Sequence, residues 1–276
     1  MKKLLACIDA SVYATSVSDF AAWAAIRLDA SVEILHVIQR NDAVSARHDI
    51  SGAIGLGAKS SLLEELVSIE EAQGKLARQQ GQLLIEAAQA RIKDAGIANT
   101  TTVHRHGGIV ETVIEREADA DLVIIGKRGA SANFAKGHLG SKVERVVRES
   151  IRPVLVASRA FAAPTRALLA FDGGDSARKA ADFLATSPLL EGIELHVVAA
   201  GHAAKHLDWA REKLPGATVT SVDGSPEDAI PAYAESHKID LLVMGAYGHS
   251  PLRQLVVGST TTAMIRACHI PVLLFR

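Results

Sequence analysis

The sequence predicts an α/β protein built from two tandem copies of a doubly wound domain, each with a five-stranded parallel sheet. Short, apolar, β-branched runs alternate with longer segments of helical periodicity, which is typical of a parallel sheet covered on both faces. The apolar runs recur in the same order in the second part of the chain. The length of 276 residues also allows two domains of ordinary size.

The repeat consists of four matched runs that are expected to form strands. Pro164 discourages a continuous helix between the two copies, so we place the linker at residues 159–164. The predicted domains are therefore residues 1–159 and 164–276. The matched runs are residues 4–9 with 168–172, 32–38 with 193–199, 121–126 with 240–245, and 153–156 with 271–274.

The segments between these runs are expected to be helices. Residues 16–28 and 73–93 show clear helical periodicity. The second connection differs between the copies. In the first copy it covers residues 41–96, where a glycine-rich loop at 51–57 precedes a long helix, whereas in the second only residues 203–214 remain.

Composition and charge exclude several classes of function. A net charge of -1, a pI near 6.8 and 4% aromatic residues argue against a protein that binds nucleic acid. No run approaches the roughly 18 apolar residues of a membrane span, and the apolar run at 4–8 is too short for a signal peptide. We therefore expect a cytoplasmic protein whose partners include neither nucleic acid nor a membrane. Cys7 and Cys268 are expected to be buried thiols, because two cysteines make neither a disulfide framework nor a structural zinc site.

A glycine motif follows the fourth expected strand of the second copy. Gly245 and Gly248 come directly after the strand, and Gly258 follows after nine intervening residues, where hydroxyl side chains at 259–261 open the last helix. Glycines let the backbone approach a phosphate closely, and amides at a helix N-terminus point toward an anion. The pattern therefore predicts a phosphate cradle, although turns alone would also account for each single glycine.

The first copy carries a related motif with one extra residue. Gly126 and Gly129 are followed, after ten intervening residues, by Gly140 and Ser141. Lys142 and Val143 stand where the second copy has two threonines. We therefore expect the two copies to bind a ligand unequally.

A carboxylate is expected at the same edge of each sheet. Asp172 follows the first strand of the second copy, and Asp9 follows that of the first. A carboxylate suits ribose hydroxyls better than phosphate, and ligands of doubly wound sheets bind at this edge. Capping of the following helix is the alternative role for both residues.

These residues resemble the universal stress protein family, whose pattern is Gly-x2-Gly-x9-Gly-Ser/Thr after the fourth strand with an Asp ending the first strand. The resemblance implies a Rossmann-like fold of the adenine nucleotide alpha hydrolase type. It also implies binding of ATP, or of ADP or AMP in its place, with Mg²⁺ as a candidate companion. Val198, taken as the end of the second strand, would pack near adenine. The implied binding residues are Ala170, Asp172, Val198, Met244, Gly245, Tyr247, Gly248, His249, Gly258, Ser259, Thr260 and Thr261, with Asp9, Gly126, Gly129, Gly140 and Ser141 in the first copy.

Two other functions stay open beside a nucleotide-responsive stress protein. One is a non-catalytic interaction scaffold that holds another ligand. The other is an ATP pyrophosphatase of the N type, because residues 171–176 resemble its Ser-Gly-Gly-x-Asp-Ser loop without the leading Ser and without the spacer residue. No catalytic triad, Cys-His pair or Walker-type lysine is visible, so at most slow ATP hydrolysis is expected.

A basic cluster surrounds the motif of the first copy. It is either a solvated face or a surface that attracts a polyphosphate. Its members are Lys127, Arg128, Lys136, His138, Lys142, Arg145 and Arg148.

The last strand of each copy bears on assembly. Residues 154–156 and 272–275 are apolar, and an uncovered edge strand leaves a row of unpaired backbone groups. We expect these strands to pair within one chain and to make a pseudo-dimer. A homodimer of such chains is expected in addition, since two-fold dimers are the commonest assemblies.

Overall fold

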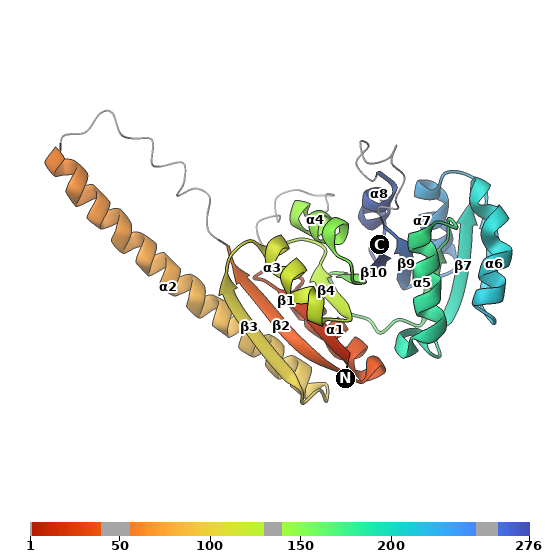
Figure 1. Cartoon of the computed structure of the whole chain (residues 1–276), viewed down its shortest axis with the longest axis horizontal. Coiled ribbons are helices and arrows are strands. Elements are labelled where there is room, and N and C mark those ends of the chain that lie inside the picture. The colour runs from red at the N-terminus through yellow and green to blue at the C-terminus, as the bar shows by residue number, and fades with distance from the viewer. Residues whose placement is uncertain (1, 40–55, 130–139, 247–258) are drawn as a thin grey trace.

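The computed structural model describes residues 2–39, 56–129, 140–246 and 259–276. The described strands form one sheet of ten, in the order β3-β2-β1-β4-β5-β10-β9-β6-β7-β8 (Figure 1). Each half of the chain therefore supplies five neighbouring strands. The first half contributes β1 (Lys2–Ile8), β2 (Ala30–Ile38), β3 (Thr100–His106), β4 (Leu122–Gly126) and β5 (Val154–Ala157). The second contributes β6 (Arg166–Ala170), β7 (Glu194–Ala200), β8 (Thr218–Val222), β9 (Leu241–Gly245) and β10 (Val272–Phe275).

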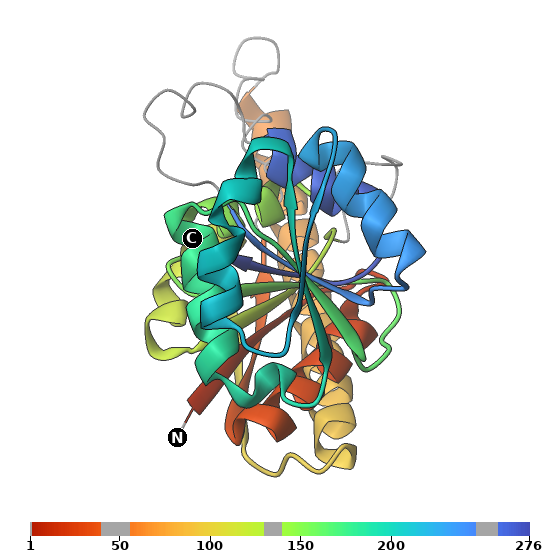
Figure 2. The same cartoon turned by 90° about the vertical axis from the view of Figure 1, so that its right-hand side faces the viewer.

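Helices cover both faces of this sheet (Figure 2). On one face, α1 (Ala14–Leu28), α2 (Leu56–Asp94), α5 (Asp175–Thr186) and α6 (Leu207–Lys213) contribute to a single apolar cluster. On the other, α3 (Ile109–Arg116), α4 (Ser141–Glu149), α7 (Pro226–Ser236) and α8 (Ser259–Ala267) contribute to a second one. Short 3₁₀ turns occur at Glu117–Asp119, Pro188–Leu190 and Gly201–His206. The predicted α/β architecture with doubly wound halves is confirmed.

The two halves meet through their last strands. Strands within each half are parallel, whereas β10 pairs antiparallel with β5, with Leu273 opposite Leu155. All four residues of each strand are buried, which fits their continuous apolar sequences. The expected pairing within one chain is confirmed. The domain boundaries at 159 and 164 fall between β5 and β6 and stay predictions.

The register corrects one of the four repeat matches. With Asp9 matched to Asp172, Leu4 of β1 corresponds to Ala167 of β6. Leu4 pairs with Val32, and Ala167 pairs with Leu195. Val32 therefore corresponds to Leu195 rather than to the residue two positions earlier. The expectation that β7 ends at Val198 is accordingly wrong, because this strand continues to Ala200.

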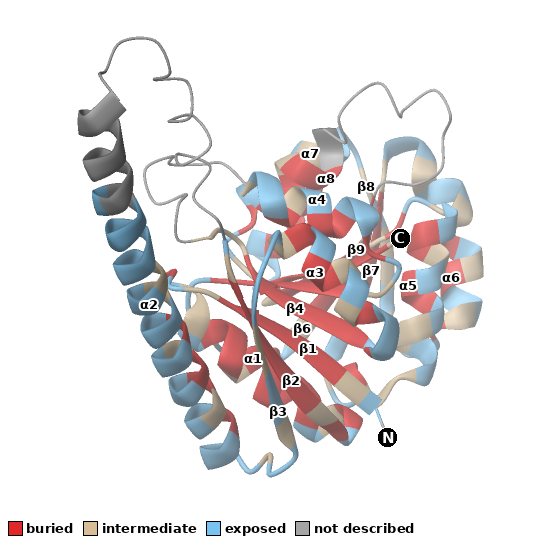
Figure 3. Ribbon diagram, turned by 60° about the vertical axis from the view of Figure 1, so that its left-hand side comes forward, coloured by how far each residue is buried: buried red, intermediate tan, exposed pale blue. Residues whose placement is uncertain are grey.

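Helix α2 has 39 residues, which confirms the long helix expected after the glycine-rich loop and extends well beyond the periodic segment 73–93. Its C-terminal part packs on the sheet through Ile85, Ala88 and Ile92, which are buried. Figure 3 shows that the outer side of this helix is exposed along its described length. Within the described residues, no helix combines the length and apolar character that a membrane crossing needs.

Candidate functional site

The strand order brings the predicted site residues to one edge of the sheet. In the second half, β6 pairs with β7 on one side and with β9 on the other. The chain thus leaves β6 in one direction and returns at β9 in the other, which makes a topological switch point. Asp172 follows β6 and Gly245 ends β9, so both lie at the carboxyl edge of this switch point. Strands β1 and β4 place Asp9 and Gly126 equivalently in the first half.

The side chains of the two aspartates stabilise local turns and do not cap the helices that follow. The Asp172 carboxylate accepts a hydrogen bond from the amide of Gly174, 2.9 Å away, and Asp9 accepts one from the amide of Ser11 at 3.0 Å. Helix α5 has Gly174 at its N-cap, and no side chain of a described residue caps it. The expected capping role is therefore wrong. Asp172 fixes a local turn with one oxygen while its side chain stays exposed at the sheet edge.

The first half brings together three of its predicted residues. A Cβ atom placed on Gly129 would lie 3.1 Å from the Asp9 carboxylate. A Cβ on Gly140 would lie 3.6 Å from the Cα of Arg128 and 3.8 Å from the amide nitrogen of Gly129. Gly140 is also the N-cap of α4, and the exposed Ser141 opens that helix. The loop, the helix start and the carboxylate therefore converge, as a cradle for an anionic ligand requires.

The first glycine of each motif has a packing role that the sequence did not reveal. A Cβ on Gly245 would lie 2.8 Å from the amide nitrogen of Ala177 and 2.9 Å from the Cβ of Ser176. A Cβ on Gly126 would lie 2.6 Å from that of Tyr13. These contacts are closer than a side chain tolerates. Both glycines thus allow a strand end to pack against the beginning of α5 or α1.

The remaining second-half residues differ in their exposure. Ala170 ends β6 and is partly exposed, whereas Val198, Met244 and Thr261 are buried. Val198 is completely buried, so it presents no surface to a ligand in this structure. Ser259 and Thr260 belong to the first turn of α8, but their side chains are outside the described part. Tyr247, Gly248, His249 and Gly258 also lie outside the described residues.

Several members of the basic cluster already have protein partners. The ammonium group of Lys127 donates a hydrogen bond to the backbone carbonyl of Cys268 at 2.7 Å. Burial lowers the pKa of Lys127, with a further contribution from the nearby positive charge of Arg128. The other pairs are Arg145 with Glu111, Arg148 with Glu144, and Lys142 with Gln39. Lys136 and His138 are outside the described residues. These contacts favour a structural role over the attraction of a polyphosphate.

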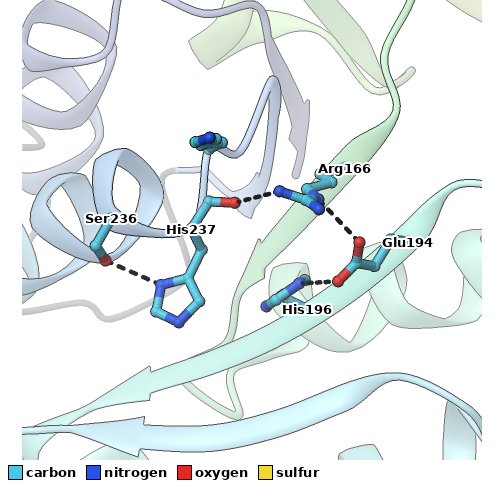
Figure 4. A pocket seen from close by; sticks show the side chains of 6 residues that line it. Arg166, Glu194, His196, Ser236 and His237 are labelled. Atoms are coloured by element: carbon cyan, nitrogen blue, oxygen red, sulfur yellow. Dashed lines mark hydrogen bonds and ion pairs between the residues drawn. The ribbon is translucent and has the colours of Figure 1, made fainter.

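A polar cavity of about 300 Å³ lies at the opposite, amino edge of the second half (Figure 4). Glu194 is the first residue of β7. Its carboxylate accepts a hydrogen bond from Arg166 at 2.9 Å and shares another with His196 at 3.0 Å. These bonds lower the pKa of Glu194. The other ring nitrogen of His196 shares a hydrogen bond with the hydroxyl of Tyr233, whose pKa is raised by burial. The sequence gives no signal for this network, because its members come from β6, β7 and α7.

Comparisons with known proteins agree on one family. The model of the universal stress protein family matches residues 1–158 and 189–276. Universal stress protein Slr1230 of Synechocystis is 39% identical over 288 residues, covering 100% of both chains. A universal stress protein from Archaeoglobus fulgidus has a similar crystal structure, with a TM-score of 0.64 and 22% identity over 99% of this chain and 96% of that one. One from Pseudomonas aeruginosa has a TM-score of 0.63 at 16% identity, over 100% and 93% of the respective chains. The solved structures show the fold shared across the whole chain.

Proposed function

Because the chain belongs to the universal stress protein family, we propose that it binds ATP or a related adenine nucleotide and responds to it as a stress-response protein. The main site is in the second half, where the sequence carries the complete glycine motif. At most, slow hydrolysis of ATP would accompany this binding. A cytoplasmic location and a homodimer of tandem chains belong to the same proposal.

One observation carries this proposal. Asp172 and Gly245 lie at the carboxyl edge of adjacent strands that form the switch point of the second half. In doubly wound sheets, this is where ligands bind. The rest of the glycine motif follows β9 in the sequence and ends at the start of α8, so the amides of the motif and of this helix start would serve the phosphates.

The residues at this edge suit an adenine nucleotide. The exposed carboxylate of Asp172 would accept hydrogen bonds from the ribose hydroxyls. The hydroxyl groups of Ser259 and Thr260 would add donors for the phosphates, and a bound Mg²⁺ would neutralise part of their charge. The convergence of Asp9, Gly129 and Gly140 in the first half supports the same kind of site in this fold.

The first experiment measures ATP binding by titration calorimetry. We expect about one tightly bound nucleotide per chain, since only the second motif is complete. Gly248→Val and Gly258→Val should abolish this binding, because a β-branched side chain would occupy the space of the phosphates. Unchanged affinity in both variants, or two sites of equal affinity, would contradict the proposal. Mass spectrometry of the purified protein then identifies any nucleotide that it retains.

A second pair of variants tests the role of Asp172. Asp172→Asn keeps an oxygen that accepts the hydrogen bond from Gly174 but removes the charge at the ribose. We expect ATP affinity to fall about tenfold, which corresponds to the loss of one charge-assisted hydrogen bond. Asp9→Asn is the matched control in the first half and should leave the main affinity unchanged. An equal loss of ATP affinity in Asp172→Asn and Asp9→Asn would show that Asp172 has no special role in the main site.

A further inference from the structure

Helix α2 has two apolar faces, and the fold covers only one of them. Gly81, Ile85, Ala88 and Ile92 are buried against the sheet. A second set, formed by Ile69, Leu76 and Leu83, is exposed by 46%, 54% and 65%. No described part of the chain therefore covers the second face.

The exposed residues form a continuous stripe. They are spaced seven residues apart, which is about two helical turns, so they lie in line along the helix. Leu83 and Ile85 are two residues apart, or about 200° around the helix, so the stripe lies opposite the face that packs on the sheet. Ala87 and Ala90 extend the stripe toward the C-terminal end of the helix. We call Ile69, Leu76, Leu83, Ala87 and Ala90 the outer stripe.

This concentration of exposed apolar residues is unusual for the molecule. Four of the seven large apolar side chains that are exposed among the described residues, Val67 and three from the outer stripe, belong to α2. Such patches commonly mark interaction surfaces. A seven-residue apolar repeat is, in particular, the pattern by which one helix packs against another.

We propose that the outer stripe is the surface through which two copies of this chain associate, with their α2 helices antiparallel. Strands β5 and β10 already pair with each other, so a second copy must use another surface. A two-fold axis near residues 79 and 80 would place Leu76 against Leu83 of the partner subunit, and Leu83 against the partner's Leu76. Such a contact is self-complementary, as a two-fold dimer requires.

The charges beside the stripe favour this partner and this direction. Lys75 and Glu86 both lie on the same side of the outer stripe, and the midpoint between them is one residue, or about 1.5 Å, from the proposed two-fold axis. Antiparallel pairing brings Lys75 close to Glu86 of the partner subunit, and the symmetry repeats this ion pair. In a parallel two-fold pair, Lys75 and the partner's Glu86 would lie on opposite sides of the stripe, so this ion pair could not form. Glu86 already accepts a hydrogen bond from Gln82 at 2.8 Å, which holds its carboxylate beside the stripe.

The proposal is tested by sedimentation of the full chain between about 5 and 200 µM, a range that covers micromolar association. We expect the wild-type protein to dimerise within this range, and Leu76→Glu with Leu83→Glu to leave a monomer. Ile151→Glu is the matched control, because Ile151 is 75% exposed and lies outside α2. Circular dichroism establishes that each variant is folded. A monomeric wild-type protein, or a dimer that survives the double substitution, would overturn the proposal.

Cysteine cross-linking tests the direction of the helices. Leu76→Cys combined with Leu83→Cys should form disulfides between subunits, because these positions face each other across the two-fold axis. Leu76→Cys alone should cross-link poorly, since the two copies of residue 76 would lie about 10 Å apart along the helix axis. Both natural cysteines are buried and give little background. Efficient cross-linking of the single variant would show parallel helices and overturn the antiparallel arrangement.

The charges provide an independent test. Lys75→Glu should weaken the dimer, and adding Glu86→Lys should restore it. If the double variant Lys75→Glu, Glu86→Lys dimerises no better than Lys75→Glu alone, the proposed ion pair is wrong. Nucleotide affinity should stay the same in all these variants, so this test and that of the proposed function fail separately.

Discussion

The ammonium group of Lys127 lies 2.7 Å from the backbone carbonyl of Cys268 and donates a hydrogen bond to it, which joins the two halves of the chain. Cys268 follows the last residue of α8, where helix carbonyls lack partners within the helix. A lysine at this position also interacts favourably with the negative end of the helix dipole. A residue of the first glycine motif thus stabilises the last helix of the second half.

Replacing Lys127 tests the strength of this contact. Lys127→Met should lower the free energy of unfolding by about 1–2 kcal/mol, because a half-buried carbonyl loses a charged donor. Urea denaturation measures the change. Lys179→Met is the control, because the exposed ammonium of Lys179 donates to the terminal carbonyl of Arg276 at 3.0 Å and should contribute less than about 0.5 kcal/mol. If both substitutions lower the free energy of unfolding equally, the contact between Lys127 and Cys268 stabilises the protein no more than an exposed one.

Gly245 should tolerate no side chain, whether or not a ligand is present. Gly245→Ala should destabilise the protein by about 1–3 kcal/mol, because the added methyl group would overlap the backbone of α5 at Ala177. Gly74→Ala in α2 is the opposite control, since no atom lies within 4 Å of the added carbon. It should stabilise the helix by about 0.5–1 kcal/mol. Thermal unfolding without nucleotide measures the stability of both variants. An unchanged melting temperature in Gly245→Ala would refute the packing role of Gly245.

Two neighbouring histidines, the buried His36 and the half-buried His104, should make stability depend on pH. The rings of His36 and His104 lie 5.0 Å apart on neighbouring strands beneath α2, and a Cβ on Gly81 would lie 2.5 Å from the Nε2 of His104. Burial lowers the pKa of both imidazoles. For His36 the neighbouring His104 adds to this effect while Asp9 opposes it, and for His104 the neighbouring His106 adds to it. The folded protein therefore favours the neutral rings.

The sign of this effect follows from the lowered pKa values. As pH falls below the ordinary histidine pKa of about 6.5, the unfolded chain takes up protons first, so stability is full above this value and declines below it. The midpoints of urea denaturation at about pH 7.5 and about pH 5.5 measure this decline in stability. His36→Leu should reduce the difference between the two midpoints, whereas His202→Leu, at an exposed site, should not. An unchanged difference in His36→Leu would contradict the assignment.

Proline at Leu273 should disrupt more than the contact between the halves. Leu273 lies in β10, which pairs with β5 on one side and with β9 on the other. Proline removes an N–H donor and is poorly tolerated inside a sheet. Small-angle scattering should therefore show an expanded, partly unfolded chain for Leu273→Pro. Thr218→Pro, at the first residue of the outermost strand β8, should stay compact. A compact Leu273→Pro would contradict the central position of β10.

The sequence predicted four strands of each half, most of the repeat and the long helix because these depend on local patterns. Runs such as residues 122–125 are apolar throughout, as strands covered on both faces must be. The glycine spacing and the two aspartates predicted the edge where the candidate site lies, since parallel strands all end at that edge. The periodicity of residues 73–93 predicted the C-terminal part of α2.

Only the tertiary structure decided the register of the second repeat match. Side chains alternate between the two faces of a strand with a period of two, so a shift of two residues, as between Val198 and Ala200, keeps every side chain on the same face. Similarly, the sequence cannot tell a glycine that approaches a ligand from one such as Gly245 that approaches another helix. Nor does it distinguish a lysine that binds phosphate from Lys127, whose partner Cys268 is 141 residues away. These roles depend on contacts between distant segments, which form only when the two halves close into one sheet.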